Sequence, residues 1–521
     1  MTLENKKTFY ITTAISYVNG APHLGHAYEA ILTDCIARFK SLDGYDVMFL
    51  TGTDEHGQKV AQTAAKRDMT PKALCDENAK LFEDMAGWLN LSNDDFIRTT
   101  EERHYTAAQD IWRRMQDNGD IYKDSYAGWY SVREEGYFDE SELTEDPETG
   151  EKRTPNGTEV EWVEESSYFF KLSEYSDKLL EYYKAHPEFI EPQSRRNEII
   201  SFVEQGLKDL SISRTKMKWG VPVPGDDDHV MYVWVDALTN YITAVGYPDT
   251  QNPKYQKYWP ADIHVIGKDI TRFHTVYWPA FLMSAGLEIP KQVFGHGFIN
   301  IDGQKMSKSL GNVIAPKTLV DQFGLDQTRY LLMREIAHGG DGNFSAEHAI
   351  ARINSDLANG LGNLAQRTLS MVAKNCDGKV PEKGILLEDD EVLLGKAYSV
   401  VNELRVLADE LKHHKCIEKI WDIVSDANAY IDAQAPWKLK KEDPIRMQSV
   451  LYTLCESIRC LGILSQWVMP ESSSKILDQL SVNKTHRGFM HLNSDHAVVS
   501  GVDLPKPEGV FPRIDVEEIA A

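Results

Sequence analysis

Two short groups of polar residues have the types and spacing that binding a polyphosphate requires. The first is Pro22-His23-Leu24-Gly25-His26, which lies between an apolar run at 8–15 and apolar residues at helical spacing over 24–41. Two imidazoles on a first helical turn can donate hydrogen bonds to phosphate oxygens, and Gly25 lets a nucleotide approach the backbone. The helix dipole and its backbone N–H groups also favour an anion there. Two ordinary histidines, or two ligands of a metal, are the alternatives.

The second group is Lys305-Met306-Ser307-Lys308-Ser309, which follows a hairpin with Asp302-Gly303 at its tip. That dipeptide suits a type I′ turn. Lysines spaced in this way in a polar loop can surround triphosphate oxygens and neutralise charge that builds up in a transition state. A solvated basic loop is the common alternative for a short Lys/Ser run.

The elements around these groups follow the alternating order of an α/β domain. Residues 8–15 and Val47–Thr51 are expected to form buried strands, and helical patterns follow both. Thr70 and Pro71 suit the N-cap and first turn of one such helix. Strands are expected again at Val230–Val235 and Ile263–Ile266. This order predicts a parallel sheet with crossover helices, interrupted by an insertion.

The chain divides further by pattern. Short alternating runs and an acidic, turn-rich stretch mark the insertion, and nearly every segment from 345 to 470 is amphipathic and helical, which predicts an α-helical bundle. We expect the first half of the α/β domain at 1–119, the insertion at 120–225, the second half at 226–344, the helical domain at 345–470, and a tail at 471–521 whose Val510–Ile514 packs back on the body.

Composition narrows the class of protein. A chain of 521 residues is expected to form several domains, and it has no apolar run long enough to span a membrane. Six scattered cysteines without a C-x-x-C pair indicate free thiols in a reducing compartment, and the N-terminus leaves no room for a targeting peptide, so we expect a cytoplasmic protein. The net charge of −24 argues mildly against a nucleic-acid partner, although a local basic stripe is enough for docking.

The two phosphate-binding groups, in this order on a divided α/β sheet, resemble the His-Ile-Gly-His and Lys-Met-Ser-Lys-Ser motifs of class I aminoacyl-tRNA synthetases, with Leu24 as a conservative change. The resemblance implies a Rossmann-type catalytic domain split by a connective insertion and followed by an all-α anticodon-binding bundle. It implies that ATP, arriving with Mg²⁺, is bound by His23, Gly25, His26, Lys305, Ser307 and Lys308, of which the histidines and lysines are the catalytic residues.

Four further segments resemble the methionine–tRNA ligases of that class. They are Ala14–Gly20, Thr51–Gly57, Tyr232–Ala237 with Tyr241, and Ile266–Ile270 with His274. The resemblance implies that Asp54 binds the substrate ammonium and that polarizable rings enclose the thioether. Core packing is the alternative for any one of these rings. The implied methionine site is Ala14, Ile15, Tyr17, Asp54, Trp234, Ala237, Leu238, Tyr241, Ile270 and His274, with Ile15 and Leu238 where some members carry Leu and Pro.

The insertion departs from the many family members that carry a zinc knuckle. Those members have a C-x-x-C pair after Gly-Trp-Tyr, whereas here Gly128-Trp129-Tyr130 is followed by Ser131 and Glu134. Ser and Glu cannot form a tetrahedral thiolate site, so we expect no structural zinc and no other bound metal. The insertion is also shorter than those of the Leu, Ile and Val enzymes, so we expect no separate editing domain.

The segment Ala433-Gln434-Ala435-Pro436-Trp437 in the predicted bundle resembles the anticodon-reading element of the family. Trp437 offers a platform for a splayed base, and Asn363 and Arg367 lie on one helical face. Lysines at 438, 440 and 441 and the run Lys412–Lys415 are expected to supply local positive charge. A core-packing tryptophan and a solvated basic face are the alternatives.

As a whole, the resemblance implies an enzyme that converts L-methionine and ATP to methionyl-adenylate and pyrophosphate, and then transfers methionine to the 3′-terminal adenosine of tRNA(Met). No general base is assigned, because positioning and electrostatics dominate such chemistry. Another apolar amino acid as substrate, a small-molecule nucleotidyltransferase, and a tRNA-binding protein without ligase activity remain alternatives. The chain has no appended tRNA-binding module after the bundle, so we expect a monomer.

Overall fold

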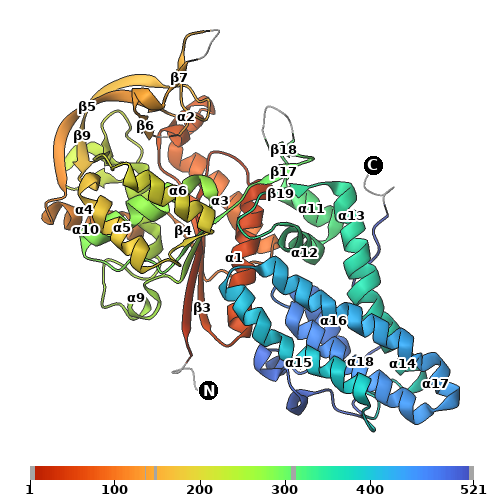
Figure 1. Cartoon of the computed structure of the whole chain (residues 1–521). Helices are drawn as coiled ribbons and strands as arrows, with labels where there is room; N and C mark the ends of the chain where they lie inside the picture. The colour runs from red at the N-terminus through yellow and green to blue at the C-terminus, as the bar shows by residue number, and fades with distance from the viewer. Residues whose placement is uncertain (1–5, 135, 146–148, 307–311, 516–521) are drawn as a thin grey trace. The chain divides into compact units, whose positions relative to one another are not determined.

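The structure is a computed structural model that describes residues 6–134, 136–145, 149–306 and 312–515. The chain forms two compact units, each assembled from segments that are separate in the sequence (Figure 1). Unit 1 comprises Met1–Lys7, His23–Val47 and Gly297–Ala521, and unit 2 comprises Thr8–Pro22 and Met48–His296.

Unit 2 is built on a seven-stranded sheet with the order β10-β16-β15-β1-β3-β2, in which β4 also pairs with β3. Strand β15 pairs in parallel with both β1 and β16, so segments from either side of the expected insertion share one sheet. The predicted α/β class with a parallel sheet is therefore confirmed. The strands are β1 (Thr8–Thr13), β2 (Ser16–Tyr17), β3 (Asp46–Asp54), β4 (Asp95–Arg98), β10 (Ile190–Glu191), β15 (Ile263–Gly267) and β16 (Val293–His296).

Among the helices of unit 2, α3 begins at a side-chain cap that the sequence predicts. In α3, Pro71 occupies the first turn and Thr70 Oγ1 accepts a hydrogen bond from the backbone N–H of Ala73, which confirms the predicted N-cap. The helices are α2 (Gln58–Lys66), α3 (Pro71–Trp88), α4 (Glu102–Asp117), α5 (Ser176–Ala185), α6 (Gln193–Glu204), α7 (Val233–Leu238), α8 (Asn240–Thr243), α9 (Pro253–Tyr258) and α10 (Trp278–Ala285).

The prediction of a strand at Val230–Val235 is wrong. Strand β14 (Asp226–Met231) pairs antiparallel with β12 (Ser213–Arg214) and β13 (Pro222–Val223) in a separate small sheet, and helix α7 begins at Val233. A short, continuous apolar run has no periodicity that separates a buried strand from a buried helix. The helix has a functional consequence, since it places Trp234, Ala237 and Leu238 on one face.

The segment predicted as an insertion contains a four-stranded antiparallel sheet with the order β11-β9-β5-β6. Its two long members, β5 (Ile121–Ser131) and β9 (Glu161–Phe170), curve side by side in Figure 1 and pair along their length. The shorter strands of this region are β6 (Gly136–Phe138), β11 (Leu210–Ser211) and the separate pair β7 (Thr144–Glu145) and β8 (Lys152–Arg153).

Unit 1 contains helix α1 (Leu24–Leu42) and a three-stranded sheet of β18 (Gln304–Lys305), β17 (Ile299–Ile301) and β19 (Gly342–Phe344). Strands β17 and β18 form the predicted hairpin, and its turn residues Asp302 and Gly303 have φ of 47° and 78°. Positive φ at both central residues fits the predicted type I′ turn.

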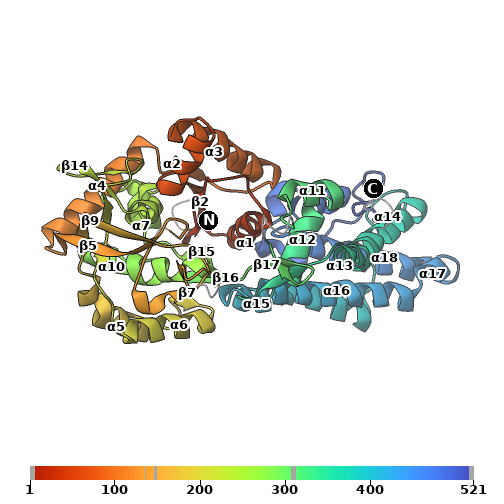
Figure 2. The same cartoon turned by 90° about the horizontal axis from the view of Figure 1, so that it is seen from above.

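The rest of unit 1 is helical, which confirms the predicted bundle. Helices α15 and α16 lie side by side in Figure 1, α18 packs against both, and Figure 2 shows the bundle from above. In the described part of the chain no helix is long and apolar enough to cross a membrane. The helices are α11 (Pro316–Phe323), α12 (Leu325–Glu335), α13 (Ala346–Arg352), α14 (Asn363–Asn375), α15 (Glu388–Asp409), α16 (His413–Gln434), α17 (Pro436–Glu442), α18 (Pro444–Ser465) and α19 (Pro470–Gln479).

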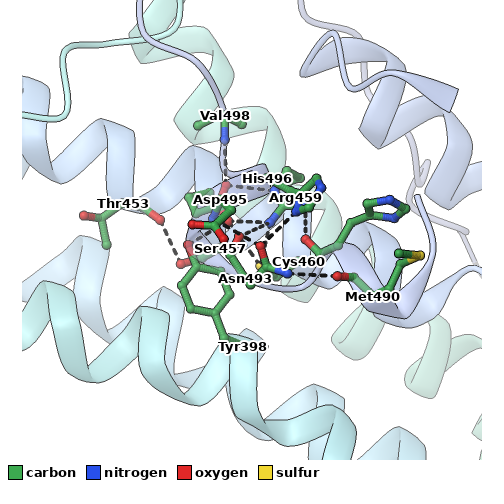
Figure 3. Close-up of polar contacts among 12 residues, drawn as sticks. Tyr398, Thr453, Ser457, Arg459, Cys460, Met490, Asn493, Asp495, His496 and Val498 are labelled. Carbon is green, nitrogen blue, oxygen red and sulfur yellow. Dashed lines mark hydrogen bonds and ion pairs between the residues drawn. The ribbon is translucent and has the colours of Figure 1, made fainter. Parts of the chain in front are cut away.

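The C-terminal segment packs on the bundle through a buried ion pair in α18. Arg459 Nη2 lies 2.6 Å from Glu456 Oε1, and both side chains are almost fully buried (Figure 3). The backbone N–H of Val498 and the hydroxyl of Tyr398 also donate to Glu456, so the segment after α19 is tied to the core of unit 1. Further on, the backbone N–H of Ile514 donates to the side chain of Asn354.

Candidate active site

A buried imidazole–phenol pair lies in unit 2. His274 belongs to a π-helical turn, Phe273–Tyr277, and its Nε2 lies 2.7 Å from the hydroxyl of Tyr241. Its Nδ1 lies 3.0 Å from the carbonyl oxygen of Ile270. Burial lowers the pKa of His274 to about 4, so the ring is neutral at pH 7. Because a carbonyl only accepts, Nδ1 carries the proton, and Nε2 accepts from Tyr241.

The indole of Trp234 lies beside this pair. It stacks on the ring of Phe273, with centroids 3.8 Å apart and an interplanar angle of 4°, and meets His274 edge-on at 6.0 Å. The sequence analysis missed Phe273, although it lies between two predicted site residues, Ile270 and His274. The π-helical turn presents Phe273 and His274 together to the indole, and such turns occur often at functional sites.

The remaining predicted methionine-site residues lie at the carboxyl ends of parallel strands or on α7. Ala14 directly follows β1 and donates its N–H to Val265 O at 3.0 Å, and Asp54 ends β3 with 8 % exposure. The carboxyl ends of parallel strands lie at one edge of a sheet, where ligands of α/β folds bind. The other four are Ile15, which is half-buried, Tyr17 of β2, whose ring lies under Lys59 Nζ at 5.5 Å, and the buried Ala237 and Leu238 of α7.

The two histidines of the first motif lie in unit 1, at the start of α1. His23 is the N-cap, and its Nδ1 accepts a hydrogen bond from the backbone N–H of Gly25 at 3.1 Å. The backbone N–H of His23 donates in turn to His26 Nδ1 at 3.1 Å, and that of Leu24 donates to Ile314 O. In the structure these N–H groups are paired within the protein.

The same contacts define the chemistry of the two rings, which stack at 3.8 Å. Burial and the neighbouring His23 lower the pKa of His26 to about 3, so His26 is neutral. Because Nδ1 of each ring accepts a hydrogen bond from a backbone N–H, Nε2 is the nitrogen that carries a proton and can donate. A Cβ on residue 25 would lie only 3.0 Å from Cε1 of His23, so glycine allows this imidazole to fold back on the helix.

Lys305 of the second motif is exposed in β18, and its Nζ lies 5.1 Å from the centroid of the Phe298 ring. Its carbonyl oxygen accepts a hydrogen bond from the side chain of Asn312 at 3.2 Å. Ser307 and Lys308 lie outside the described residues.

A carboxylate lies where the resemblance would place the second cysteine of a zinc knuckle. Glu134 accepts hydrogen bonds from the hydroxyls of Thr154 and Thr158, the second at 2.6 Å, and from Asn156 at 2.9 Å. Ser131 Oγ lies 2.9 Å from Thr158 Oγ1. Burial opposes ionisation of Glu134, but these hydrogen bonds hold its pKa below the ordinary value. Hydrogen bonds to this carboxylate join the turn that holds Glu134 to the turn at 154–158.

In the helical bundle of unit 1, two of the three predicted base-reading residues contact each other. The guanidinium of Arg367 on α14 lies 5.5 Å from the centroid of the Trp437 ring on α17, and it pairs with Asp432 at 2.8 Å. Trp437 is 43 % exposed, which is unlike a core residue. Asn363 begins α14 and is exposed on the same helical face as Arg367.

The predicted basic run at 412–415 is not a positive patch. Lys412 pairs with Glu410 at 2.8 Å and Lys415 with Glu418 at 2.7 Å. His413 is buried, and burial lowers its pKa to about 3. The acidic neighbours on the same helix and the turn before it therefore cancel the charge of the run.

Comparison with known proteins gives one consistent result. The model of class I tRNA synthetases (M) matches residues 9–369, and that of the anticodon-binding domain of methionyl tRNA ligase matches residues 380–521. The chain is 56 % identical to the methionine–tRNA ligase of Mesorhizobium japonicum, over 98 % of each chain, and 54 % identical to that of Mycobacterium bovis, over 97 % of this chain and 98 % of that one.

A solved structure agrees. The methionyl-tRNA synthetase of Mycobacterium tuberculosis in complex with methionyl-adenylate superimposes with a TM-score of 0.95 at 54 % identity, over 97 % of this chain and all of that one. With both family models and near full-length relatives in agreement, the chain belongs to the methionine–tRNA ligases of the class I aminoacyl-tRNA synthetases.

Proposed function

We propose that this chain activates L-methionine with ATP and then transfers the methionine to the 3′-terminal adenosine of tRNA(Met). The observation that carries the methionine assignment is the Tyr241–His274 pair, whose hydrogen bond fixes a neutral imidazole beside the stacked Trp234 and Phe273 rings. Neutral, polarizable groups suit an unbranched thioether, which a charged imidazole would not. Asp54 supplies the carboxylate for the substrate ammonium.

In the activation step, the methionine carboxylate attacks the α-phosphorus of ATP and pyrophosphate leaves. His23 and His26 donate from Nε2 to phosphate oxygens, since their Nδ1 atoms are occupied by the backbone of α1. Lys305 and Lys308 stabilise the charge on the departing pyrophosphate, and Mg²⁺ enters as part of the nucleotide substrate. Gly25 and Ser307 complete the ATP-binding set. No general base is needed, because a carboxylate is already the nucleophile.

In the transfer step, the anticodon of tRNA(Met) is read in the helical bundle by Asn363, Arg367 and Trp437. The half-exposed indole provides a stacking surface, and the adjacent guanidinium provides donors for base edges. We propose domain bounds with catalytic halves at 1–119 and 226–344, the insertion at 120–225, the anticodon-binding domain at 345–470 and the packed tail at 471–521.

We further propose that the insertion folds without zinc. The hydrogen bonds that Thr154, Asn156 and Thr158 donate to Glu134 join two turns of this region without a metal. Metal analysis of purified protein is the test. Stoichiometric zinc together with inactivation by chelators would contradict this proposal and leave the ligase assignment intact.

We also propose that the enzyme works as a cytoplasmic monomer. The six cysteines are free thiols, and five of them are buried, as expected in a reducing compartment. Light scattering after size-exclusion chromatography tests the monomer, because the measured molar mass of a dimer would be twice that of the 59.1 kDa chain.

Amino-acid-dependent ATP–pyrophosphate exchange, run separately with each proteinogenic amino acid, tests the whole assignment. Exchange with methionine above all others is expected. Exchange with a different apolar amino acid would reassign the substrate. No exchange with any of them, in protein shown to be folded, would favour a tRNA-binding protein without ligase activity.

A further inference from the structure

Asp236 is a carboxylate in the interior of unit 2 that none of the roles above uses. It lies on α7 and is fully buried. Its Oδ2 lies 2.7 Å from Nδ1 of His56, and its Oδ1 lies 2.7 Å from Nε2 of His104. An ionised carboxylate only accepts hydrogen bonds, so both imidazoles donate to it.

The charge of Asp236 persists in spite of its burial. Burial alone would raise the pKa of this carboxyl, but the adjacent His56 and His104 outweigh that effect and hold the pKa at about 2. The group is therefore ionised throughout the physiological range. Hydrogen bonds to a charged group are shorter and stronger than neutral ones, so this junction is stiff.

The two imidazoles attach Asp236 to the elements that carry the methionine site. On helix α7, Trp234, Ala237 and Leu238 share one face, and Asp236 lies on the opposite face. His56 follows Asp54 by two residues in the segment that leaves β3. The buried carboxylate of Asp236 thus joins the helix that bears Trp234 to the segment that bears Asp54, through contacts on the face of α7 opposite Trp234.

The ring nitrogens of His56 and His104 that do not contact Asp236 have further partners. His56 Nε2 lies 2.9 Å from the Tyr105 hydroxyl, and the His56 ring meets the indole of Trp219 edge-on at 5.3 Å. Burial raises the pKa of Tyr105 to about 12, so its hydroxyl remains protonated and donates. His104 Nδ1 lies 3.3 Å from Oγ1 of Thr243, which shares helix α8 with Tyr241.

We propose that Asp236 is a positioning residue for methionine: through His56 and His104 it fixes the distance between the carboxylate of Asp54 and the aromatic wall on α7. The ammonium and the side chain of a small substrate must be bound simultaneously, so a shift of about an ångström between these groups weakens binding strongly. This inference rests on the proposed methionine specificity, and it adds a residue that does not touch the substrate.

If Asp236 had only a structural role, its substitution should lower stability and leave the KM for methionine unchanged, because a buried ion pair often contributes to stability alone. Asp120 provides the matched control. It is also a buried carboxylate of unit 2, and it accepts hydrogen bonds from Tyr175, Ser284 and Asn118, none of which belongs to the methionine site. Asp120→Asn should lower the melting temperature and leave the KM for methionine within about twofold of the wild type.

The test is Asp236→Asn in the full chain, measured by methionine-dependent ATP–pyrophosphate exchange. Asparagine has the same shape, but its amide N–H₂ would face an imidazole donor. We expect the KM for methionine to rise about ten- to a hundredfold, while the KM for ATP changes by less than about twofold. A melting temperature lowered as far as in Asp120→Asn, with both KM values unchanged, would overturn the proposal.

A second pair of variants keeps the proposal testable if Asp236→Asn does not fold. His104→Gln retains an amide donor near the position of Nε2 and should keep the wild-type KM for methionine, whereas His104→Ala removes that donor and should raise it. Equal KM values for the two would overturn the proposal. Wild-type protein without methionine-dependent exchange would instead refute the proposed function, so the two failures are distinct.

Discussion

Tyr241 and His274 in unit 2 are each 1 % exposed, whereas Trp437 in the helical bundle of unit 1 is 43 % exposed. In the buried pair, His274 donates from Nδ1 to the carbonyl oxygen of Ile270. Its Nε2 must therefore accept from the Tyr241 hydroxyl. Trp437 has a cation–π neighbour, Arg367, and otherwise offers its ring to solvent. The Tyr241–His274 pair is thus shielded from solvent, whereas the Trp437 ring is partly exposed to it.

This difference decides how a mutation should act in each region. In a buried polar site, removing one partner leaves the other without a hydrogen bond or with an uncompensated charge, and neither can be repaired by water. At an exposed platform the loss is limited to the stacking energy itself. Mutations in the buried region should therefore have the larger effects, and these should appear in the binding and activation of methionine. Mutations in the exposed region should affect only the reaction with tRNA.

The largest effect is expected from Asp54→Asn. The variant keeps the shape of the side chain but leaves the substrate ammonium without its counter-charge. Breaking a buried pair in this way costs roughly 3–5 kcal/mol, on the order of a hundred- to several-thousandfold in kcat/KM for methionine. Pyrophosphate exchange measures the loss, and binding of tRNA should be unchanged in a filter assay.

Asp84→Asn is the control for this prediction. Asp84 is an exposed carboxylate on α3 that pairs with Lys80. Surface changes of this kind lie within about 0.5 kcal/mol, so exchange should remain near the wild-type rate. If Asp54→Asn behaved like Asp84→Asn, Asp54 would not be the ammonium site, and the comparison between buried and exposed regions would lose its strongest support.

Much of this architecture was predictable because it is local. The N-cap at Thr70, the strand Ile263–Ile266 and the turn at Asp302-Gly303 each depend on neighbouring residues, and the structure has all three. The strand expected at Val230–Val235 failed because a continuous apolar run fits a buried helix equally well, and long-range packing decides between the two.

The site shows the same limit. The resemblance named Tyr241 and His274, but not their hydrogen bond, which joins residues 33 positions apart in the chain. The start of α1 was expected to favour an anion, but the hydrogen bonds that the side chains of His23 and His26 accept from its backbone N–H groups were not predicted. Asp236 had one visible signal, since it is a lone acidic residue in an apolar run, but its partners His56 and His104 lie 180 and 132 residues away.

A smaller effect is expected from Tyr241→Phe. It deletes one hydroxyl and leaves the buried Nε2 of His274 without a donor, which costs about 1–3 kcal/mol. The affinity for methionine should therefore fall about five- to 150-fold, as measured by calorimetry. Tyr122→Phe is the matched control, because the Tyr122 hydroxyl bonds to Asp209 in an exposed pair. Equal, small effects of the two variants would mean that burial of the His274 pair does not matter.

Trp437→Ala should act on the second half-reaction alone. Stacking of a base on an aromatic ring is worth about 1–3 kcal/mol, so aminoacylation efficiency should drop about five- to 150-fold while pyrophosphate exchange stays near wild type. A tRNA with a CAU anticodon should lose its advantage over altered anticodons. Ile445→Ala removes another exposed apolar side chain of the bundle and should change neither activity. Parallel loss of exchange and charging, with a lower melting temperature, would make Trp437 a packing residue.

The smallest effect is expected from pH, and the reason is again burial. An exposed imidazole with a pKa near 6.5 is mostly neutral at pH 7.5 and mostly protonated at pH 5.5. Burial lowers the pKa of His274 to about 4, so it remains neutral over that range and keeps accepting from Tyr241. The stability that comes from the neutral ring is fully present above about pH 6.5 and is lost as the pH falls from there through about 4.

Methionine affinity measured by calorimetry should accordingly change less than about twofold between pH 7.5 and 5.5. A tenfold loss with a midpoint near 6.5 would mean that His274 is open to water, and the methionine site would then resemble the exposed platform of Trp437.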